Sequence, residues 1–386
     1  MNRPERPTAI AASERKDRIE RLCTEMEKDN LGAVLLGPTA SLRYFTGVAW
    51  HPSERFTGAL VRRNGSVEYI TPGFERDKLA QIVGVPGEIV TWQEDDSPYR
   101  LIADRLGNVA RLAVDESVAL FTWFGLCAAI DSARLTRGGP LLNRLRRRKS
   151  KAELALMQYA KDMTLEVHRR AWKMLRRRVR ATEVAAFIDE EHRRLGGSGN
   201  IFCIVSFGED TALPHGGEGD RMLKQGDAVL IDTGTSVEGY NSDITRSYVF
   251  GEPGAEYRRV WDAEKRAQAA AFEAALPGAT CESVDAAARA SLMRDGFGPD
   301  YKLPGLPHRT GHGIGLEVHE APNLVRGDRT PLAEGMCFSN EPMIVVPDKF
   351  GIRLEDHFYM TASGACWFTQ PQPSLDEPFE GATPWD

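Results

Sequence analysis

The first third of the chain alternates between helical and strand-like patterns of hydrophobic residues. Residues 14–30 carry apolar side chains three and four positions apart among charges, which is the spacing of an amphipathic helix. Residues 33–36 form a short, wholly apolar run typical of a buried strand. Two strand-like runs within 58–70 flank Asn64-Gly65, a pair that favours a hairpin turn, and 111–115 is a further strand. The pattern predicts an α/β domain with a mixed sheet.

The rest of the chain repeats one plan twice. Ser150 and Glu153 form a helix capping box, the S-x-x-E pattern at a helix start. Helical patterns then cover four segments, 151–177, 182–195, 256–275 and 281–294. Strand-like runs follow each pair of helices, so we expect an internally duplicated domain with a pseudo-two-fold axis and a site where its two sheets meet. The basic run before Ser150 divides the chain into expected domains 1–148 and 149–386.

Composition narrows the class of protein. The chain has 386 residues and a formal net charge of −6, which gives no support to a nucleic-acid partner. The basic run 144–149 is expected to be a solvated linker or helix start rather than a phosphate-binding patch. Six scattered cysteines without a C-x-x-C pair predict reduced, mostly buried thiols. No segment resembles a signal peptide or a membrane span, so we expect a cytoplasmic protein with no membrane partner.

Candidate chemistry gathers around His308, His312 and His319, three of the eight histidines, which lie within twelve residues. The glycines between them allow the backbone to pass close to a bound group. Upstream, Asp232 ends an apolar run and Asp243 lies on the returning arm of a glycine-bracketed hairpin, so the two carboxylates can converge. Taken alone, a His-x3-His pair is more typical of a solvated loop, and such aspartates are more typical of turns and helix caps.

Two glutamates complete a set that suits metal ions. Glu341 and Glu355 each follow an apolar, strand-like run, as Asp232 and Asp243 do. Four carboxylates and the imidazole of His312 are hard to bury except around cations, and they are too many ligands for one tetrahedral zinc ion. The oxygen-rich set suits two divalent ions, which support hydrolysis by activating water and polarising a carbonyl group. No H-E-x-x-H or G-x-S-x-G motif supports a single-zinc peptidase or a serine hydrolase.

In order and spacing these residues resemble the metal ligands of the pita-bread metallopeptidases, the group that contains methionine aminopeptidase, aminopeptidase P and prolidase. The resemblance extends from residue 151 to about residue 370, and His215, His308 and His319 match further histidines of the family. Residues 42–47 resemble the creatinase-type N-terminal domain of the prolidase and aminopeptidase P branch. The resemblance implies an α/β creatinase-like N-terminal domain followed by an α+β pita-bread catalytic domain with an internal duplication.

The resemblance also implies a role for each residue of the site. The implied ligands of two divalent metal ions are Asp232, Asp243, His312, Glu341 and Glu355, with Asp243 and Glu355 bridging the ions. Manganese is the expected metal, with cobalt or zinc as alternatives. The implied catalytic and substrate-binding residues are Glu341 as general base, His319 and His215 at the substrate carbonyl, His308 at the residue after the scissile bond, and Arg353 behind the carboxylates.

The activity that the resemblance implies is hydrolysis of the Xaa-Pro bond, in dipeptides as by a prolidase. One alternative is cleavage of longer peptides, as by aminopeptidase P. Another is a non-peptide small substrate, as in the creatinase-like, ectoine-hydrolase-like and lyase branches. A catalytically inactive binding module is disfavoured because the chain retains all five ligands and has no charged tail.

Two residues depart from the family pattern. Met343 stands where the family usually has glycine, and it is expected to narrow the space beside Glu341. Asn323 stands where prolidases often carry an arginine that binds the free carboxylate of the dipeptide. A dipeptidase would then need Arg326 or an arginine of the N-terminal domain, or the enzyme would accept longer peptides.

The remaining expectations concern residues outside the motifs. The family implies a homodimer, in which Trp50, His51 and Arg55 of a partner subunit are hypothetical gate residues. His168 and His192 lie in helical patterns and are predicted to be surface residues. His357, like these two, matches no motif and receives no role.

Overall fold

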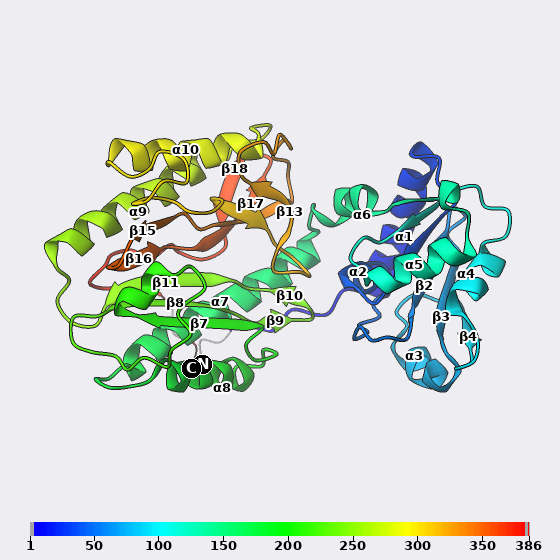
Figure 1. The fold of residues 1–386 in the computed structure, drawn as a ribbon, viewed down its shortest axis with the longest axis horizontal. Helices are drawn as coiled ribbons and strands as arrows, with labels where there is room; N and C mark the ends of the chain where they lie inside the picture. The colour runs from blue at the N-terminus through cyan, green and yellow to red at the C-terminus, as the bar shows by residue number, and fades with distance from the viewer. Residues whose placement is uncertain (1–3, 383–384, 386) are drawn as a thin grey trace. The chain divides into compact units, whose positions relative to one another are not determined.

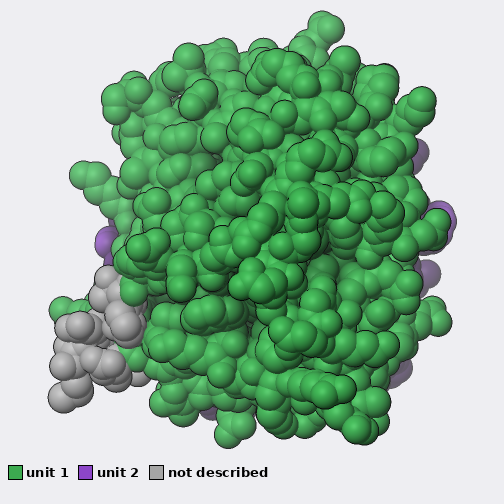
Figure 2. Space-filling model, turned by 90° about the vertical axis from the view of Figure 1, so that its left-hand side faces the viewer, with its two compact units in different colours: residues 1–9, 147–386 green, residues 10–146 purple. Residues whose placement is uncertain are grey.

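The computed structural model describes residues 4–382 and 385, and the chain divides into two compact units. Residues 10–146 form unit 2, and residues 1–9 with 147–386 form unit 1 (Figure 2). In the described part of the chain, no helix combines the length and the apolar character needed to cross a membrane.

Unit 2 is built on a six-stranded mixed sheet with strand order β4-β3-β2-β1-β5-β6 (Figure 1). The strands are β1 (Ala33–Leu36), β2 (Gly58–Arg62), β3 (Val67–Pro72), β4 (Glu88–Trp92), β5 (Leu112–Val114) and β6 (Leu135–Arg137). The helices are α1 (Ala12–Lys28), α2 (Ala40–Thr46), α3 (Arg76–Ile82), α4 (Pro98–Leu106), α5 (Leu120–Ala129) and α6 (Gly139–Arg146). β1 runs antiparallel to β2 and parallel to β5, while β2 and β3 form the predicted hairpin. The prediction of a mixed α/β sheet is confirmed.

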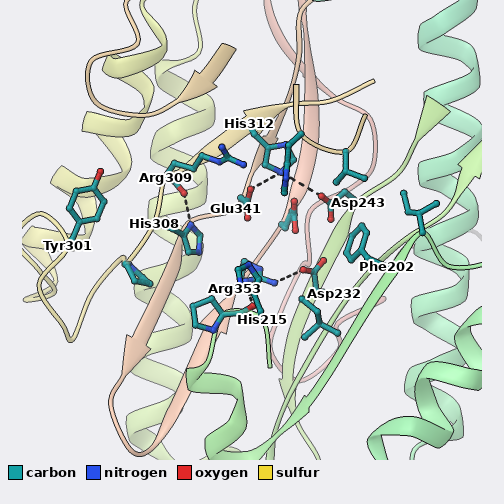
Figure 3. Close-up of a pocket in the computed structure, with 17 residues that line it drawn as sticks. Phe202, His215, Asp232, Asp243, Tyr301, His308, Arg309, His312, Glu341 and Arg353 are labelled. Carbon is teal, nitrogen blue, oxygen red and sulfur yellow. Dashed lines mark hydrogen bonds and ion pairs between the residues drawn. The ribbon is translucent and has the colours of Figure 1, made fainter. Parts of the chain in front are cut away.

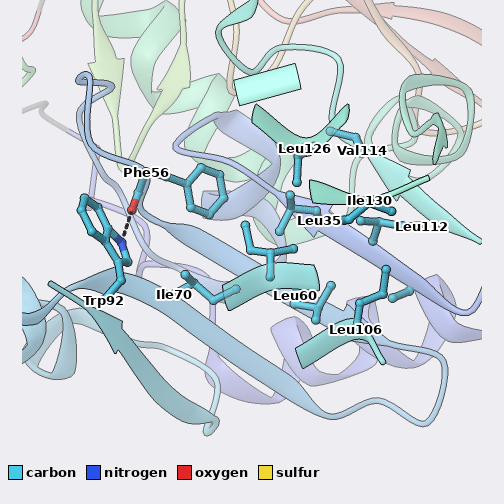
Figure 4. Packing of buried hydrophobic residues seen from close by; sticks show 12 residues of the cluster. Leu35, Phe56, Leu60, Ile70, Trp92, Leu106, Leu112, Val114, Leu126 and Ile130 are labelled. Carbon is cyan, nitrogen blue, oxygen red and sulfur yellow. Dashed lines mark hydrogen bonds between the residues drawn. The ribbon is translucent and has the colours of Figure 1, made fainter. Parts of the chain in front are cut away.

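A hydrophobic cluster packs between this sheet and helices α4 and α5 (Figure 4). Its labelled members are Leu35, Phe56, Leu60, Ile70, Trp92, Leu106, Leu112, Val114, Leu126 and Ile130. The Nε1–H group of Trp92 donates to the carbonyl oxygen of Phe56 at 3.3 Å, so the polar atom of this ring is paired inside the core. Burial of each large apolar side chain contributes about 1.5–3 kcal/mol, which gives unit 2 a core of its own.

Unit 1 carries helices on two sides of its strands (Figure 1). Its first half comprises α7 (Lys151–Met174), α8 (Ala181–Arg194), β7 (Phe202–Phe207), β8 (Ala228–Gly234), β9 (Ser236–Val237), β10 (Tyr240–Asn241) and β11 (Ile244–Val249). Its second half begins with α9 (Ala255–Ala274) and α10 (Cys281–Arg294). The strands that follow are β12 (Gly311–Gly313), β13 (Glu320–Leu324), β14 (Cys337–Asn340), β15 (Met343–Val346), β16 (Phe350–Arg353), β17 (Asp356–Thr361) and β18 (Gly364–Trp367). The predicted capping box of Ser150 and Glu153 is present at the start of α7.

Matching hydrogen bonds confirm the internal duplication. In the first half, the N–H group of Arg178 donates to the carbonyl oxygen of Leu223 at 2.8 Å, just before α8. In the second half, the N–H group of Gly278 donates to the carbonyl oxygen of Leu332 at 2.8 Å, just before α10. Both donors have a positive φ, 71° and 84°, and an isolated β-bridge follows each of them. The same local geometry therefore precedes the second helix of each half.

Two expectations about exposure are wrong or only partly right. The basic run is not a solvated linker, because Arg146 and Lys149 are only 5% and 8% exposed. The Nζ atom of Lys149 lies 2.8 Å from Oε2 of Glu320 in a buried ion pair, which accounts for the burial of its charge. The cysteines are free thiols as predicted, but only Cys281 and Cys337 of the six are buried.

The prediction that His168 and His192 lie at the surface is wrong, since both side chains are fully buried. Nε2–H of His168 donates to the carbonyl oxygen of Ile244 at 2.9 Å. Nδ1–H of His192 donates to Oδ1 of Asn200 at 2.8 Å, because the amide nitrogen of Asn200 is already bound to the carbonyl oxygen of Ala185. Burial lowers the pKa of His168 to about 3 and that of His192 to about 4, so both rings are neutral at pH 7.

This burial makes the stability contribution of His192 dependent on pH. Its pKa is about 4 in the folded chain and 6.5 without the fold, so the unfolded chain takes up the proton first as the pH falls. The stabilisation is complete above pH 6.5 and is lost as the pH falls toward 4. We expect His192→Gln to destabilise the protein more at pH 7 than at pH 4.5, by up to about 3 kcal/mol.

Urea unfolding of the full chain at the two pH values measures this difference. His51→Gln, at an exposed position, is the matched control and is expected to change the unfolding free energy little at either pH. Equal destabilisation by His192→Gln at both pH values would contradict the prediction.

Candidate metal centre

The first half of unit 1 brings two of the candidate carboxylates together (Figure 3). Asp232 lies in β8 directly opposite Thr245 of β11, and Asp243 lies two residues before Thr245. Because side chains alternate along a strand, all three point to the same face of the hairpin. Thr245 also forms an isolated β-bridge with Glu355, which connects this hairpin to the second half.

The second half supplies the other three candidates. His312 is the central residue of β12, Glu341 directly follows β14, and Glu355 lies between β16 and β17. Gly311 is required beside His312, because a Cβ atom there would lie 2.1 Å from the carbonyl oxygen of Ser339. The hydroxyl group of Ser339 accepts the His312 N–H at 2.8 Å and donates to Oε1 of Glu341 at 3.0 Å. One serine thereby orients two of the candidate ligands.

The two nitrogen atoms of the His312 imidazole have different surroundings, and one of them faces carboxylates. Nδ1–H donates to the carbonyl oxygen of Gly313 at 3.0 Å. Nε2 lies 3.0 Å from Oε1 of Glu341 and 3.6 Å from Oδ2 of Asp243. A lone pair on Nε2 would repel both carboxylates, so either a proton or a metal cation must lie between this nitrogen and the carboxylate oxygens. The position of Nε2 is that of a metal-ligating nitrogen.

Unpaired buried oxygens give a second reason to expect cations. Oδ1 of Asp232, Oδ1 of Asp243 and Oε1 of Glu355 are buried and have no hydrogen-bond partner among the residues that the structure describes. Burial, and after it the repulsion from neighbouring carboxylates, among them Glu341, raises the pKa of Asp243 and of Glu355 well above its ordinary value. A bound divalent cation removes both penalties, and an oxygen-rich set with one imidazole is chemically suited to it.

Three overlapping groups of side chains could each hold an ion, since their ligand atoms lie within 4.8 Å of one another. These groups are Asp243 with His312 and His319, Asp243 with Glu355 and His357, and His312 with Glu341 and Glu355. His357 received no role from the sequence, although it lies two residues after Glu355 and so on the same face of an extended strand. That period of two is the signal that could have identified it.

Arg353 lies behind the carboxylates and is almost fully buried. Its Nη2 atom forms an ion pair with Oδ2 of Asp232, and its Nε–H donates to the hydroxyl group of Thr245 at 3.0 Å. Thr245 in turn donates to Oε2 of Glu355 at 2.7 Å, and Nη1 of Arg353 donates to the carbonyl oxygen of Pro214 at 3.0 Å. Arg353 therefore positions two carboxylates together with the loop that carries the neighbouring His215.

The three remaining candidate histidines line the same cavity, which has a volume of about 810 Å³. His308 donates from Nδ1 to the carbonyl oxygen of Arg309 at 2.7 Å, which leaves Nε2 buried without a partner in the described part of the chain. The ring of His319 lies edge to face with His312 at 4.2 Å between centroids. Burial, with nearby positive charge, lowers the pKa of His319 to about 4. His215 completes the set.

Further lining residues carried no motif in the sequence. They are Ile201, Phe202, Ile204, Pro214, Tyr301, Pro307, Arg309 and Val318.

Met343 packs directly beside the centre, with its sulfur 3.8 Å from Nη1 of Arg353. Asn323 lies opposite His312 in the β12 and β13 pairing, and Arg326 is an exposed residue in an ion pair with Asp300. Trp50, His51 and Arg55 belong to a loop of unit 2, where their role as a gate stays a prediction.

Comparisons with known proteins identify relatives of both parts of the chain. The model of metallopeptidase family M24 matches residues 155–362, and that of the creatinase/prolidase N-terminal domain matches residues 18–148. The putative dipeptidase YkvY of Bacillus subtilis is 32% identical over 363 residues, which cover 92% of this chain and 98% of the relative. Dipeptidase PepE of Mycobacterium ulcerans superposes with a TM-score of 0.88 at 33% identity, over 95% of this chain and 99% of that one. A recombinant prolidase of Thermococcus sibiricus gives a TM-score of 0.85 at 28% identity, over 92% and 96%.

Proposed function

The chain belongs to metallopeptidase family M24 and carries a creatinase/prolidase N-terminal domain, and on this premise we propose that it hydrolyses Xaa-Pro bonds, chiefly in dipeptides. The observation that carries the proposal is a group of four carboxylates and one imidazole, all buried except the 13% exposed side chain of Glu341, in a cavity lined by three further histidines. Relatives named dipeptidase and prolidase, similar over nearly the whole chain, support the choice of substrate class.

The residues that would hold two divalent ions are Asp232, Asp243, His312, Glu341 and Glu355, and Asp243 and Glu355 each belong to two of the three groups that could hold an ion. Manganese is the proposed metal, since oxygen-rich sites favour it over softer metals. When bound, the two ions activate water and polarise the scissile carbonyl group. Arg353 holds Asp232 and the Thr245 hydroxyl group in place through its ion pair and hydrogen bond.

Glu341 is proposed to act as the general base. Its Oε1 atom accepts a hydrogen bond from the Ser339 hydroxyl group, which leaves Oε2 to take the proton and pass it to the leaving nitrogen. Burial acts to raise the pKa of Glu341, but positive charge at His312, together with His308 and Arg353, outweighs burial and keeps the pKa below its ordinary value. A cation bound at His312 acts in the same direction. The carboxylate is therefore charged at neutral pH and ready to accept a proton.

The histidines of the cavity are proposed to bind the substrate around the scissile bond. His319 has a pKa of about 4, so it is neutral at pH 7 and can donate a hydrogen bond to the substrate carbonyl oxygen. His215 supports the same oxygen from the opposite half of unit 1. His308 presents its unpaired Nε2 atom to the residue after the scissile bond, beside Pro307 and Tyr301, whose apolar surfaces suit a pyrrolidine ring.

The second candidate activity is removal of one residue from longer Xaa-Pro peptides, and Asn323 is the observation that favours it. Asparagine at this position carries no positive charge for the free carboxylate of a dipeptide. A non-peptide substrate is the third candidate. These activities share the metal centre and differ only in what the cavity binds beyond the scissile bond.

Substrate length and metal dependence are tested together. We expect metal-free protein to leave Ala-Pro intact, and added manganese to restore hydrolysis, while Ala-Pro-Ala is cleaved more slowly. Chromatography measures the release of proline from Ala-Pro and of the dipeptide Pro-Ala from Ala-Pro-Ala, with the protein-bound metal determined in parallel. Cleavage of the tripeptide alone would favour the aminopeptidase activity. Cleavage of neither peptide by protein that holds metal would contradict hydrolysis of Xaa-Pro bonds.

Three further properties are part of the proposal. The catalytic domain is proposed to comprise residues 149–386 and the N-terminal domain residues 1–148. A homodimer is proposed from the family resemblance, and a cytoplasmic location from the six scattered cysteines, which are free thiols. Sedimentation velocity of the purified chain tests the dimer directly, since a monomer has 42.8 kDa.

A further inference from the structure

Arg309 occupies the wall of the cavity next to a proposed substrate-binding residue. It directly follows His308 and lies two residues before β12, and its side chain is partly buried in the cavity lining. Its Nη1 atom donates to Oδ1 of Asn323 at 3.0 Å. Asn323 is held in turn by its backbone, whose N–H donates to Oδ2 of Asp328 at 2.9 Å. The guanidinium group is therefore fixed at a defined place in the wall.

The charge of Arg309 is not neutralised by the protein. Arg309 and Arg353 are the two arginines among the described residues that line the cavity, and Arg353 is paired with Asp232. No described residue places a carboxylate within ion-pair distance of Arg309. A half-buried cation without a counter-ion is suited to bind an anion from a ligand.

Arg326 does not meet the same conditions, although the sequence suggested it as the carboxylate-binding residue. Its side chain is 58% exposed, forms an ion pair with Asp300, and is absent from the cavity lining. A solvent-exposed and already paired guanidinium contributes little to binding.

We propose that Arg309, positioned by Asn323, binds the C-terminal carboxylate of a dipeptide substrate. The inference rests on the proposed function, since it assigns a partner to the free carboxylate that a Xaa-Pro dipeptide has. Arg309 follows His308, which is placed at the residue after the scissile bond, so its charge lies on the side where that carboxylate must lie. In this chain Asn323 contributes by holding the guanidinium group of Arg309 in place, whereas an arginine at position 323 would itself carry the positive charge.

Paired substrates test the inference. Ala-Pro and Ala-Pro-amide differ only in the terminal charge, and the wild-type protein with manganese is expected to prefer the free acid in kcat/KM by about 10- to 100-fold. Arg309→Met is expected to lose this preference by raising KM for the acid, while hydrolysis of the amide is retained. Arg326→Met is the matched arginine control and is expected to keep the preference. Asn323→Ala is expected to raise KM for the acid several-fold and to leave KM for the amide unchanged.

The outcomes separate this inference from the proposed function. If the wild type cleaves neither substrate, the proposed function fails. If it cleaves both equally, or if Arg309→Met keeps the preference, Arg309 does not bind the carboxylate although the function stands. Should Arg309→Met lose activity on both substrates, Arg309→Lys decides the question. A reduced preference in that variant supports the inference, and an unchanged preference overturns it.

Discussion

Glutamine in place of Glu341 is expected to lower kcat for a Xaa-Pro dipeptide by about 10³-fold while the protein stays folded. The amide has nearly the shape of the carboxylate, so its oxygen can still accept the hydrogen bond from Ser339, 3.0 Å away in the parent chain. It cannot take up a proton, which removes the proposed general base. Because the carboxylate also faces Nε2 of His312, the substitution weakens the metal centre as well.

Turnover of Ala-Pro under saturating manganese, with the bound metal quantified in the same sample, separates the two effects. Glu273→Gln, an exposed residue of α9, is the matched control and is expected to retain full activity. A decrease of less than tenfold in Glu341→Gln with metal fully bound would show that another group accepts the proton.

Asp243→Asn is expected to remove bound metal and, with it, the activity. Asp243 belongs to two of the three groups that could hold an ion. Loss of one carboxylate charge close to a cation costs on the order of 4 kcal/mol even at a high effective dielectric constant, which is about 10³-fold in Kd. The metal-free protein is expected to become more stable, because the substitution removes a buried charge and its repulsion with Glu355, which raise the pKa of Asp243 in that order of size.

Thermal unfolding with and without manganese measures both effects. The metal-free variant is expected to unfold at a higher temperature than the metal-free wild type, and added manganese should stabilise only the wild type. Asp262→Asn, exposed on α9, is the control and should behave like the wild type in both conditions. A variant that is still stabilised by manganese as strongly as the wild type would exclude Asp243 as a ligand.

The candidate site was largely accessible to sequence analysis because of how its members are placed. Asp232, Asp243, Glu341 and Glu355 lie within strands or directly beside strand ends, so a polar residue after an apolar run is visible in the sequence. The spacing of these residues along the chain also matches that of the family. Spacing does not show which face of the sheet each side chain points to, and His357 was missed because no motif contains it.

The predictions for His168 and His192 were wrong because their hydrogen-bond partners come from other segments of the chain. His168 and His192 are polar residues in amphipathic helices, and helical periodicity alone places such residues outside. In the structure the partners of His192 are Asn200 and Thr164, of which Thr164 lies in α7, and the partner of His168 is in β11. The two histidines are buried and hydrogen-bonded because these distant segments pack against their helices in the folded chain.

Arg309 was missed for a related reason. The family pattern places a carboxylate-binding arginine at position 323, where this chain has Asn323. The sequence analysis therefore suggested the nearest arginine after it, Arg326. The structure pairs β12 with β13, which brings the residue fourteen positions earlier to the side chain of Asn323. Which residues of two paired strands lie opposite each other depends on the register of the pairing, and the register cannot be deduced from the spacing of residues along the sequence.

The duplicated halves of unit 1 also bear on the ancestry of the protein. Two proposed ligands come from the first half and three from the second, so neither half alone could assemble the centre. An ancestral protein with a single half would have needed two associated copies, and identical copies would have supplied identical ligands. Fusion into one chain turns that association into an intramolecular event with an effective concentration of about millimolar. It also allows the two halves to differ, and in this chain the first half supplies two aspartates where the second supplies a histidine and two glutamates.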